Sequence, residues 1–252
     1  MRVFFVGAGP GAPELLTIKA EKLLRSCRCC IYAGSLVSPA VIGLIPADAE
    51  RYDSAKLSLD EMVDIYLNAQ RRDVDVVRLH SGDPAIYGAI REQMQLLDHH
   101  GIAYEVVPGI SSFQAAAAAL GLELTAPEVA QTVILTRTSG RTPLPKEQEL
   151  ENLARTRATL CIFLSAHKME DVTRTLAEYY GGDCPAAVVY RASWPDQVAI
   201  EGTLSDITKK AESAGIKKTA MILVGWALSG DVPRSKLYDR DFSHGYREAR
   251  KK

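Results

Sequence analysis

Residues 7–13, with the sequence GAGPGAP, follow a short apolar run at residues 2–6 that has the pattern of a buried strand. The spacing in this first glycine loop fits G-x-G-x-x-G/A, the fingerprint of a dinucleotide site. Against that interpretation, Pro10 and Pro13 remove backbone N–H donors that would face a pyrophosphate, and no acidic residue ends the next predicted strand. A turn without a ligand is one alternative. We favour another, a loop that brings bare backbone close to a different kind of ligand.

Two further loops have the same context. The second loop, HSGDPAIYG at residues 80–88, and the third loop, VPGISS at residues 107–112, each follow a predicted strand and precede a predicted helix. Asp83 either caps the helix ahead of Pro84 or accepts hydrogen bonds from a ligand. Because ligands of open α/β sheets bind at the carboxyl ends of the strands, the three loops together predict one small-molecule site.

The elements that must position these loops alternate between short β-rich runs and amphipathic segments, which is typical of α/β proteins. In the first half, strands are expected at residues 2–6, 29–33, 74–80 and 102–107, and helices at 17–26, 59–70, 86–99 and 111–120. In the second half, strands are expected at 132–136, 159–164, 186–191, 197–201 and 220–225, and helices at 147–155, 168–179 and 205–214. A pause at residues 121–131 predicts a domain boundary. We therefore expect domains at 1–122 and 123–230, followed by a polar, basic tail at 231–252.

Composition excludes several classes of protein. A net charge of -1 argues against extended electrostatic binding to a nucleic-acid backbone. No apolar stretch reaches the roughly 20 residues of a membrane helix. The first apolar run is too short for a secretory signal, and the five cysteines form no disulfide framework or metal-ligand pattern. We expect free structural thiols, no metal site, no membrane contact and a cytoplasmic location.

Together these segments resemble the tetrapyrrole methyltransferase family, which uses S-adenosylmethionine. The matching segments are residues 6–11 (VGAGPG) with Leu16 and Thr17, 81–84 (SGDP), 107–112 and 221–225 (MILVG). Within the family, residues 131–137 with 140–143, 190–196 (YRASWPD) and 225–228 (GWAL) are similar to enzymes that methylate C11 of precorrin-4 or cobalt-precorrin-4 in cobalamin biosynthesis. Ala12 stands where the family often has Asp, so no carboxylate acts at that position.

The resemblance implies two α/β domains with a ligand cleft between them, a homodimer, and S-adenosylmethionine as cofactor, with S-adenosylhomocysteine as its product. Carried over position by position, it assigns the donor contacts to Pro10, Ser81, Gly82, Asp83, Ile86, Ser111, Ser112, Leu164, Ala192, Ala220 and Met221.

The resemblance also places the first glycine loop toward the tetrapyrrole. Candidate substrate residues are Gly9 and Gly11 in that loop, the arginines Arg137, Arg141 and Arg191, which suit a polycarboxylate, and Trp194. Trp194 either flanks the macrocycle or is core, whereas Tyr87 is expected in the core. No catalytic residue is assigned, because a sulfonium is already a good leaving group and the chain mainly has to hold the methyl in line.

Other functions stay open at this point. One is a methyltransferase of the same family acting at another tetrapyrrole position or on RNA or protein. Another is a nucleotide-binding module without catalytic turnover, which the G-x-G-x-x-A spacing supports. The near-neutral charge and the C11-type segments favour the tetrapyrrole substrate.

Overall fold

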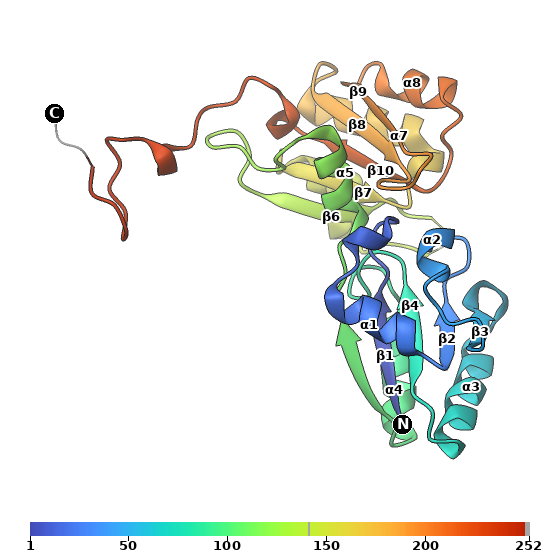
Figure 1. Cartoon of the computed structure of the whole chain (residues 1–252). Helices are drawn as coiled ribbons and strands as arrows, with labels where there is room; N and C mark the ends of the chain where they lie inside the picture. Colours follow the sequence, from blue (N-terminus) through green and yellow to red (C-terminus); the bar gives the residue numbers. More distant parts are fainter. Residues whose placement is uncertain (141, 250–252) are drawn as a thin grey trace. The chain divides into compact units, whose positions relative to one another are not determined.

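Apolar runs and amphipathic segments fold into two five-stranded sheets, one in each of two units of the computed structural model (Figure 1). The structure describes residues 1–140 and 142–249. Unit 1 comprises Met1–Ala116 and Arg191–Val198, and unit 2 comprises Ala117–Tyr190 and Ala199–Lys252. The prediction of a mixed α/β protein is confirmed. The boundary expected at residue 122 stays a prediction, and no sequence pattern predicted that residues 191–198 group with the first unit.

The sheet of unit 1 has the strand order β3-β2-β4-β1-β5, with every neighbouring pair parallel. Its strands are β1 (Arg2–Gly7), β2 (Cys29–Tyr32), β3 (Glu50–Asp53), β4 (Val76–His80) and β5 (Ala103–Val107). Because all five run the same way, their carboxyl ends share one edge. The three glycine-bearing loops follow β1, β4 and β5, and β1 lies between β4 and β5 in the sheet.

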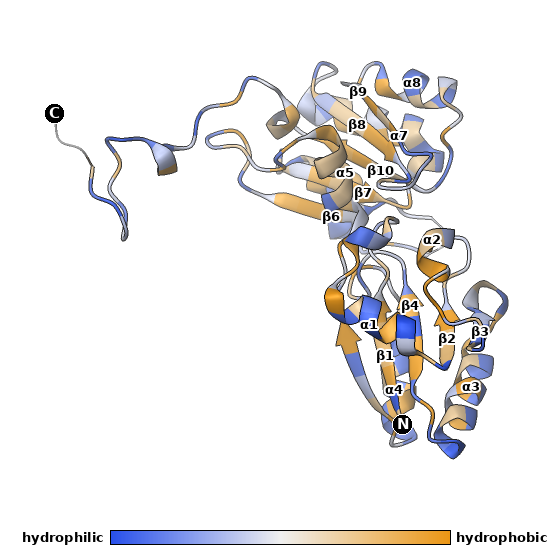
Figure 2. Cartoon of the chain, viewed as in Figure 1, coloured by the Kyte–Doolittle hydropathy of each residue, from blue (hydrophilic) through white to orange (hydrophobic). Residues whose placement is uncertain are grey.

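Both faces of this sheet are covered by helices, because successive residues of each strand point to opposite sides. Val6 and Leu79 pack with α1 (Ile18–Ser26) and α2 (Pro39–Ile42) on one face. Phe5 and Ile31 pack with α3 (Leu59–Arg71) and α4 (Ile90–His99) on the other. Figure 2 shows the resulting concentration of apolar residues along the strands.

The sheet of unit 2 is mixed, with the order β6-β7-β10-β8-β9. The strands are β6 (Val133–Arg137), β7 (Thr159–Phe163), β8 (Pro185–Tyr190), β9 (Val198–Thr203) and β10 (Ala220–Val224). β6 and β7 are parallel, whereas β10 is antiparallel to β7 and β8. One face packs against α6 (Leu150–Ala154), α7 (Met169–Tyr180) and α8 (Ile207–Ser213). The remaining helix, α5 (Ser112–Leu120), spans the boundary between the units.

The expected elements need correction at β3, α2 and α4. β3 and α2 were not expected, because β3 is a polar edge strand (ERYD) without apolar alternation and α2 has only four residues. α4 begins at Ile90 rather than at residue 86, because Tyr87 and Ala89 have left-handed backbone angles (φ 55° and 48°) that interrupt a helix. The polar, basic tail at 231–252 stays a prediction; within it, Tyr238 is 83% and Tyr246 100% exposed.

Candidate functional site

The first and second glycine loops are hydrogen-bonded to each other. The N–H of Gly9 donates to the carbonyl of Gly82 (3.2 Å), and the N–H of Gly82 donates to the carbonyl of Gly9 (2.8 Å). The N–H of Ala8 donates to the carbonyl of His80 (2.7 Å). The structure therefore brings together two segments that lie about 70 residues apart in the chain, as expected from parallel strands whose ends share one edge.

Three glycines, one from each loop, touch where the loops meet. A Cβ built on Gly109 would lie 2.2 Å from the carbonyl oxygen of Gly82 and 2.9 Å from the Cα of Gly7. A Cβ on Gly7 would lie 2.7 Å from the Cα of Gly109. Gly82 also has φ of +62°, a conformation that favours glycine. These glycines are required for loop-to-loop packing, a role that spacing along the sequence does not reveal.

Asp83 connects the second loop to the third. Its Oδ1 accepts the N–H of Ala85 (2.7 Å), and its Oδ2 accepts the N–H of Gly109 (2.9 Å). It does not cap a helix, because α4 begins only at Ile90. A carboxylate has about four acceptor positions, so each oxygen retains capacity for a ligand.

The other donor candidates in unit 1 surround this junction. Ser111 is buried and its N–H donates to Oε1 of Gln114 (2.9 Å), whereas Ser112 begins α5 and is half-buried. Ser81 and Ile86 are half-buried in the second loop. Tyr87, expected in the core, is 47% exposed because it lies in the turn that precedes α4.

The first glycine loop is fixed by side chains from two distant segments. Ser38, just before α2, donates to the carbonyl of Gly11. The indole Nε1 of Trp194 donates to the carbonyl of Pro10 (2.8 Å), and the N–H of Ala12 donates to Oγ of Ser193 (3.0 Å). A Cβ on Gly11 would lie 2.1 Å from Cδ1 of Trp194, so the indole occupies the space beside Gly11.

Gly9 requires glycine for a different reason. Its φ is +65°, and a Cβ there would lie 3.1 Å from the carbonyl oxygen of Leu15. Gly9 and Gly11 are both buried, each against another part of unit 1. Their assignment to the tetrapyrrole stays a prediction. A substitution at either glycine also disturbs its contact with Leu15 or Trp194, so its effect on stability must be measured as well.

Arg191 and Trp194 lie in one turn of unit 1, with Ala192 buried between them. The guanidinium of Arg191 stacks on the indole, 4.7 Å from the ring centroid, and pairs with Asp196 (2.6 Å). The turn is tight, with left-handed φ at Arg191 (44°) and Ser193 (68°). The sequence placed Arg191 and Trp194 as separate substrate contacts, and the structure places them as neighbours.

In unit 2, the substrate candidate Arg137 binds its own chain. Its guanidinium donates to the carbonyls of Thr138 (3.2 Å), Thr142 (3.0 Å) and Pro143 (3.2 Å), and so holds the loop after β6. Arg141 lies outside the described residues.

The donor candidates of unit 2 differ in exposure. Leu164 follows β7, is 65% exposed and has φ of +56°. Ala220 and Met221 begin β10, and Met221 is only 3% exposed. Among these three residues, Leu164 alone presents a large apolar side chain at the surface of its unit.

Sequence reasoning missed a buried polar cluster behind the second loop. Arg78 is 6% exposed and donates to Oε1 of Gln93 (3.2 Å) and to the carbonyl of Leu79 (3.3 Å). Gln93 also accepts from the hydroxyl of Tyr66 (2.9 Å) and donates to the carbonyl of Ala89 (2.9 Å). The cluster ties β4 to the turn before α4. The sequence feature that could have predicted this cluster is the pair of polar residues, Arg78 and His80, two positions apart in the otherwise apolar strand VVRLH.

His80 is the last residue of that strand and is 5% exposed. Its Nε2 is buried without a hydrogen-bond partner among the described residues. Burial, and to a lesser degree the charge of Arg78, lower the pKa of His80 from 6.5 to about 3. The ring is therefore neutral at physiological pH.

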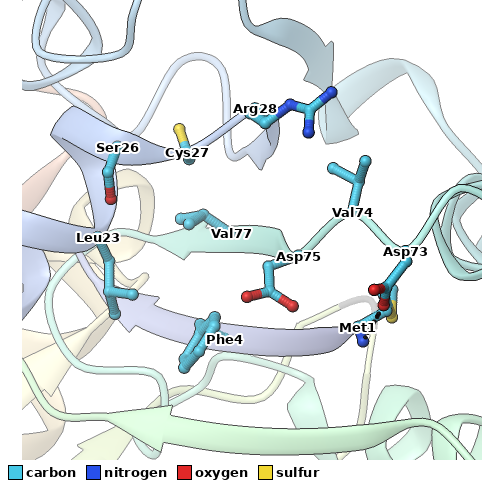
Figure 3. Close-up of a pocket in the computed structure, with 10 residues that line it drawn as sticks. All are labelled: Met1, Phe4, Leu23, Ser26, Cys27, Arg28, Asp73, Val74, Asp75 and Val77. Atoms are coloured by element: carbon cyan, nitrogen blue, oxygen red, sulfur yellow. Dashed lines mark hydrogen bonds and ion pairs between the residues drawn. The ribbon is translucent and has the colours of Figure 1, made fainter.

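A cavity of about 400 Å³ lies at the opposite edge of the unit 1 sheet (Figure 3). Its lining includes Met1, Asp73 and Asp75, which precede β1 and β4, together with Cys27 and Arg28. None of the predicted donor or substrate residues lines it. The predicted site at the carboxyl edge is therefore separate from this cavity.

Two further classes of site are not seen in residues 1–140 and 142–249. No three His, Cys, Asp or Glu side chains gather there in a way that could hold a metal ion. None of the helices in the same residues has the length and apolar character needed to cross a membrane. At the junction of its three glycine-bearing loops, unit 1 offers backbone N–H and carbonyl groups, serine hydroxyls and the carboxylate of Asp83. Such a set suits holding a ligand better than acid–base chemistry.

Comparisons with known proteins identify the family of the chain. A sequence model of the family described as Tetrapyrrole (Corrin/Porphyrin) Methylases matches residues 2–208. The cobalt-precorrin-4 C(11)-methyltransferase of Methanocaldococcus jannaschii is 48% identical over 253 residues, which cover 100% of this chain and 98% of the relative. The precorrin-4 C(11)-methyltransferase of Pseudomonas aeruginosa is 47% identical over 248 residues, covering 98% of this chain and 99% of the relative.

Solved structures show the same likeness. The X-ray structure of a cobalt precorrin-4 methyltransferase superimposes with a TM-score of 0.88 at 44% identity, covering 90% of this chain and 96% of the other. The uroporphyrin-III C-methyltransferase of Thermus thermophilus, complexed with S-adenosylhomocysteine, gives a TM-score of 0.75 at 29% identity, covering 90% of this chain and 99% of the other.

Proposed function

Because the chain belongs to the tetrapyrrole (corrin/porphyrin) methylase family, we propose that it transfers a methyl group from S-adenosylmethionine to C11 of precorrin-4 or cobalt-precorrin-4. This is a step of cobalamin biosynthesis. The observation that carries the proposal is full-length identity of 47–48% to two relatives with that activity. The segments at residues 131–137, 190–196 and 225–228 support the same position on the macrocycle.

The junction of the three loops in unit 1 fits the proposed methyl donor. The donor's amino-acid end carries an ammonium and a carboxylate, and the junction offers carbonyls, N–H groups, serine hydroxyls and the free acceptor capacity of Asp83. The donor contacts proposed in unit 1 are Pro10, Ser81, Gly82, Asp83, Ile86, Ser111, Ser112 and Ala192. Leu164, Ala220 and Met221 of unit 2 are proposed on family membership alone.

When bound, S-adenosylmethionine would supply a methyl group on a sulfonium, whose sulfur leaves as the neutral thioether of S-adenosylhomocysteine without acid catalysis. The chain's own residues then have to bind and orient the two reactants. Holding them about 3–3.5 Å apart and in line is worth about 7–11 kcal/mol of the barrier. The rigid loop junction, locked by three contacting glycines and by Asp83, supports this positioning role. No residue is assigned as a catalytic base.

For the tetrapyrrole we propose contacts from Gly9, Arg137, Arg141 and Arg191, and we propose that Gly11 and Trp194 contribute by shaping the first glycine loop. Arg191 suits a substrate carboxylate through a guanidinium that is already oriented by the Trp194 ring and Asp196. Arg137 holds its own loop through three carbonyls, so its contribution includes shaping the loop that contains residue 141.

The test is incubation of the purified chain with S-adenosylmethionine and either precorrin-4 or cobalt-precorrin-4 in separate reactions. The expected result is a mass gain of one methyl group in at least one reaction, located at C11 by NMR. Calorimetry with S-adenosylhomocysteine and with NAD is the companion measurement. Micromolar binding of NAD without binding of S-adenosylhomocysteine overturns the proposal in favour of a nucleotide-binding module.

A methyltransferase acting on another tetrapyrrole position, on RNA or on protein would bind S-adenosylhomocysteine and leave both precorrin-4 forms unmethylated.

We further propose a cytoplasmic homodimer. The five free thiols, all buried, fit a reducing compartment. Light scattering during size-exclusion chromatography measures the oligomeric state directly, and a monomer at micromolar concentration contradicts the dimer.

A further inference from the structure

We propose that Trp194 is a positioning residue for the first glycine loop. Its indole fixes residues 10–12 after β1 and thereby sets the surface that the loop presents to the methyl acceptor. This inference rests on the proposed function, in which that loop contacts the tetrapyrrole. It differs from a stacking role, because here Trp194 acts through the loop.

The contact between the indole and the loop is close and specific. Nε1 donates to the carbonyl of Pro10 at 2.8 Å. An ideal Cβ on Gly11 would lie 2.1 Å from Cδ1 and 2.4 Å from Nε1 of the same ring. The ring therefore rests where a side chain of residue 11 would be, and glycine is needed there because of Trp194.

Neighbouring contacts fix the rest of the loop. Ser38 donates to the carbonyl of Gly11, and Ser193, adjacent to Trp194, accepts the N–H of Ala12 (3.0 Å). Side chains thus hold a polar backbone group of each of three consecutive residues. The loop cannot shift without breaking at least one of these hydrogen bonds.

Trp194 is itself held in place. The guanidinium of Arg191 covers one face of the ring, 4.7 Å from the centroid, and pairs with Asp196. The N–H of Trp194 donates to the carbonyl of Arg191 (2.9 Å), and the N–H of Ser193 donates to Oε1 of Gln197 (2.7 Å). Left-handed backbone at Arg191 and Ser193 costs energy that the surrounding contacts must offset, and such strain concentrates at functional segments.

These contacts leave Trp194 poorly suited to stack on a macrocycle, since Arg191 covers one face and the ring edge meets Pro10 and Gly11. They suit a rigid support for the loop. A displacement of about 1 Å at a reacting centre can lower a rate about 100-fold, so the support matters for the rate even without direct contact.

The first experiment compares Trp194→Phe with Trp226→Phe. Both indoles donate to one backbone carbonyl, Trp194 to Pro10 (2.8 Å) and Trp226 to Tyr180 (3.3 Å). For Trp194→Phe we expect kcat to fall about tenfold or more while the Kd of S-adenosylhomocysteine stays within about threefold. For Trp226→Phe we expect a similar loss of melting temperature with unchanged kcat. Equal kcat in Trp194→Phe and the wild type overturns the positioning role.

The second experiment is a double-mutant cycle between Gly11→Ala and Trp194→Ala, read by melting temperature and by kcat. If the indole occupies the space beside Gly11, Gly11→Ala lowers both quantities in the wild-type background and changes neither in the Trp194→Ala background. If Gly11 faces the tetrapyrrole directly, Gly11→Ala lowers kcat equally in both backgrounds, which overturns the proposal. Should Trp194→Ala fail to fold, Trp194→Leu takes its place.

The two readouts separate this proposal from the proposed function. A wild-type chain that methylates neither precorrin-4 form overturns the proposed function, and with it the link to the acceptor. The double-mutant cycle read by melting temperature needs no substrate. If the melting-temperature changes of the two single variants simply add in the double variant, the contact between Gly11 and Trp194 is overturned, whatever the outcome of the methylation assay.

Discussion

The Asp83 carboxylate accepts the N–H of Gly109, 26 residues away in the chain, at 2.9 Å, while its other oxygen accepts the N–H of Ala85. This bond joins the loop after β4 to the loop after β5, on either side of the loop after β1. The same carboxylate is the one that the family resemblance assigns to the methyl donor. One side chain therefore shapes the junction and is available to a ligand there.

Asp83→Ala is expected to weaken the binding of S-adenosylhomocysteine at least tenfold, because the second and third loops lose their connection. Losing two hydrogen bonds is expected to cost about 1–3 kcal/mol of stability. Isothermal calorimetry and urea unfolding measure the two effects.

Asp53→Ala is the matched control. Asp53 likewise accepts one N–H two residues ahead, from Ala55 (3.0 Å), and one from a distant loop, from Gly34 (3.1 Å), but both reach its Oδ1 and it ends the edge strand β3. We expect a similar loss of stability with unchanged affinity for S-adenosylhomocysteine. A comparable loss of affinity in both variants would mean that Asp83 acts on the donor only through general destabilisation.

Gly109→Ala is expected to destabilise the chain by about 1–3 kcal/mol or more, because the added Cβ would lie 2.2 Å from the carbonyl oxygen of Gly82. Gly140→Ala is the control, since a Cβ at residue 140 meets no atom of the described residues within 4 Å and its φ is not left-handed. Urea unfolding measures both. A Gly109→Ala variant as stable as Gly140→Ala would show that the loops move apart at little cost.

Gly9→Ala is expected to depress methyl transfer while S-adenosylhomocysteine affinity stays within about threefold, if the first loop faces the acceptor. Because Gly9 has a left-handed φ of +65°, alanine there is expected to lower the stability of the folded chain by about 1–2 kcal/mol. Thermal unfolding without ligand must therefore accompany the assay. Asparagine tolerates this conformation better, and Gly9→Asn separates the strain from the added side chain. Parallel losses of donor binding and turnover in Gly9→Asn contradict the placement of the two ligands.

Stability is expected to fall below pH 6.5 through His80. Its pKa is lowered to about 3 in the folded chain, so between pH 6.5 and 3 the unfolded state binds a proton that the folded state does not. Stability therefore rises with pH across that window, by up to about 1.4 kcal/mol per pH unit. At pH 5 this amounts to a loss of about 2 kcal/mol relative to pH 8.

Replacing His80 by Gln removes this titration, so the difference in unfolding free energy between pH 5 and pH 8 should shrink by that amount. An unchanged pH dependence in His80→Gln would show that the ring protonates in the folded chain without penalty.

Local patterns were sufficient to predict most elements and the class of the fold. The apolar run at residues 2–6, the strand expected at 74–80 and the helix expected at 59–70 rest on neighbouring residues, and the structure confirms them as β1, β4 and α3. The motifs likewise carried the resemblance to the family that the comparisons confirm. The sequence failed where local signals are weak or in conflict, as in the polar edge strand β3 and the late start of α4.

Tertiary structure alone decided why particular residues are needed at the candidate site. The contact among Gly7, Gly82 and Gly109, the bridge from Asp83, and the packing of Trp194 on Gly11 all join residues far apart in the chain. The sequence shows that a glycine is present. Only the folded structure shows which distant residue a Cβ at that position would clash with. Backbone hydrogen bonds between loops also leave no pattern of side-chain types, because every residue carries the same N–H and carbonyl groups.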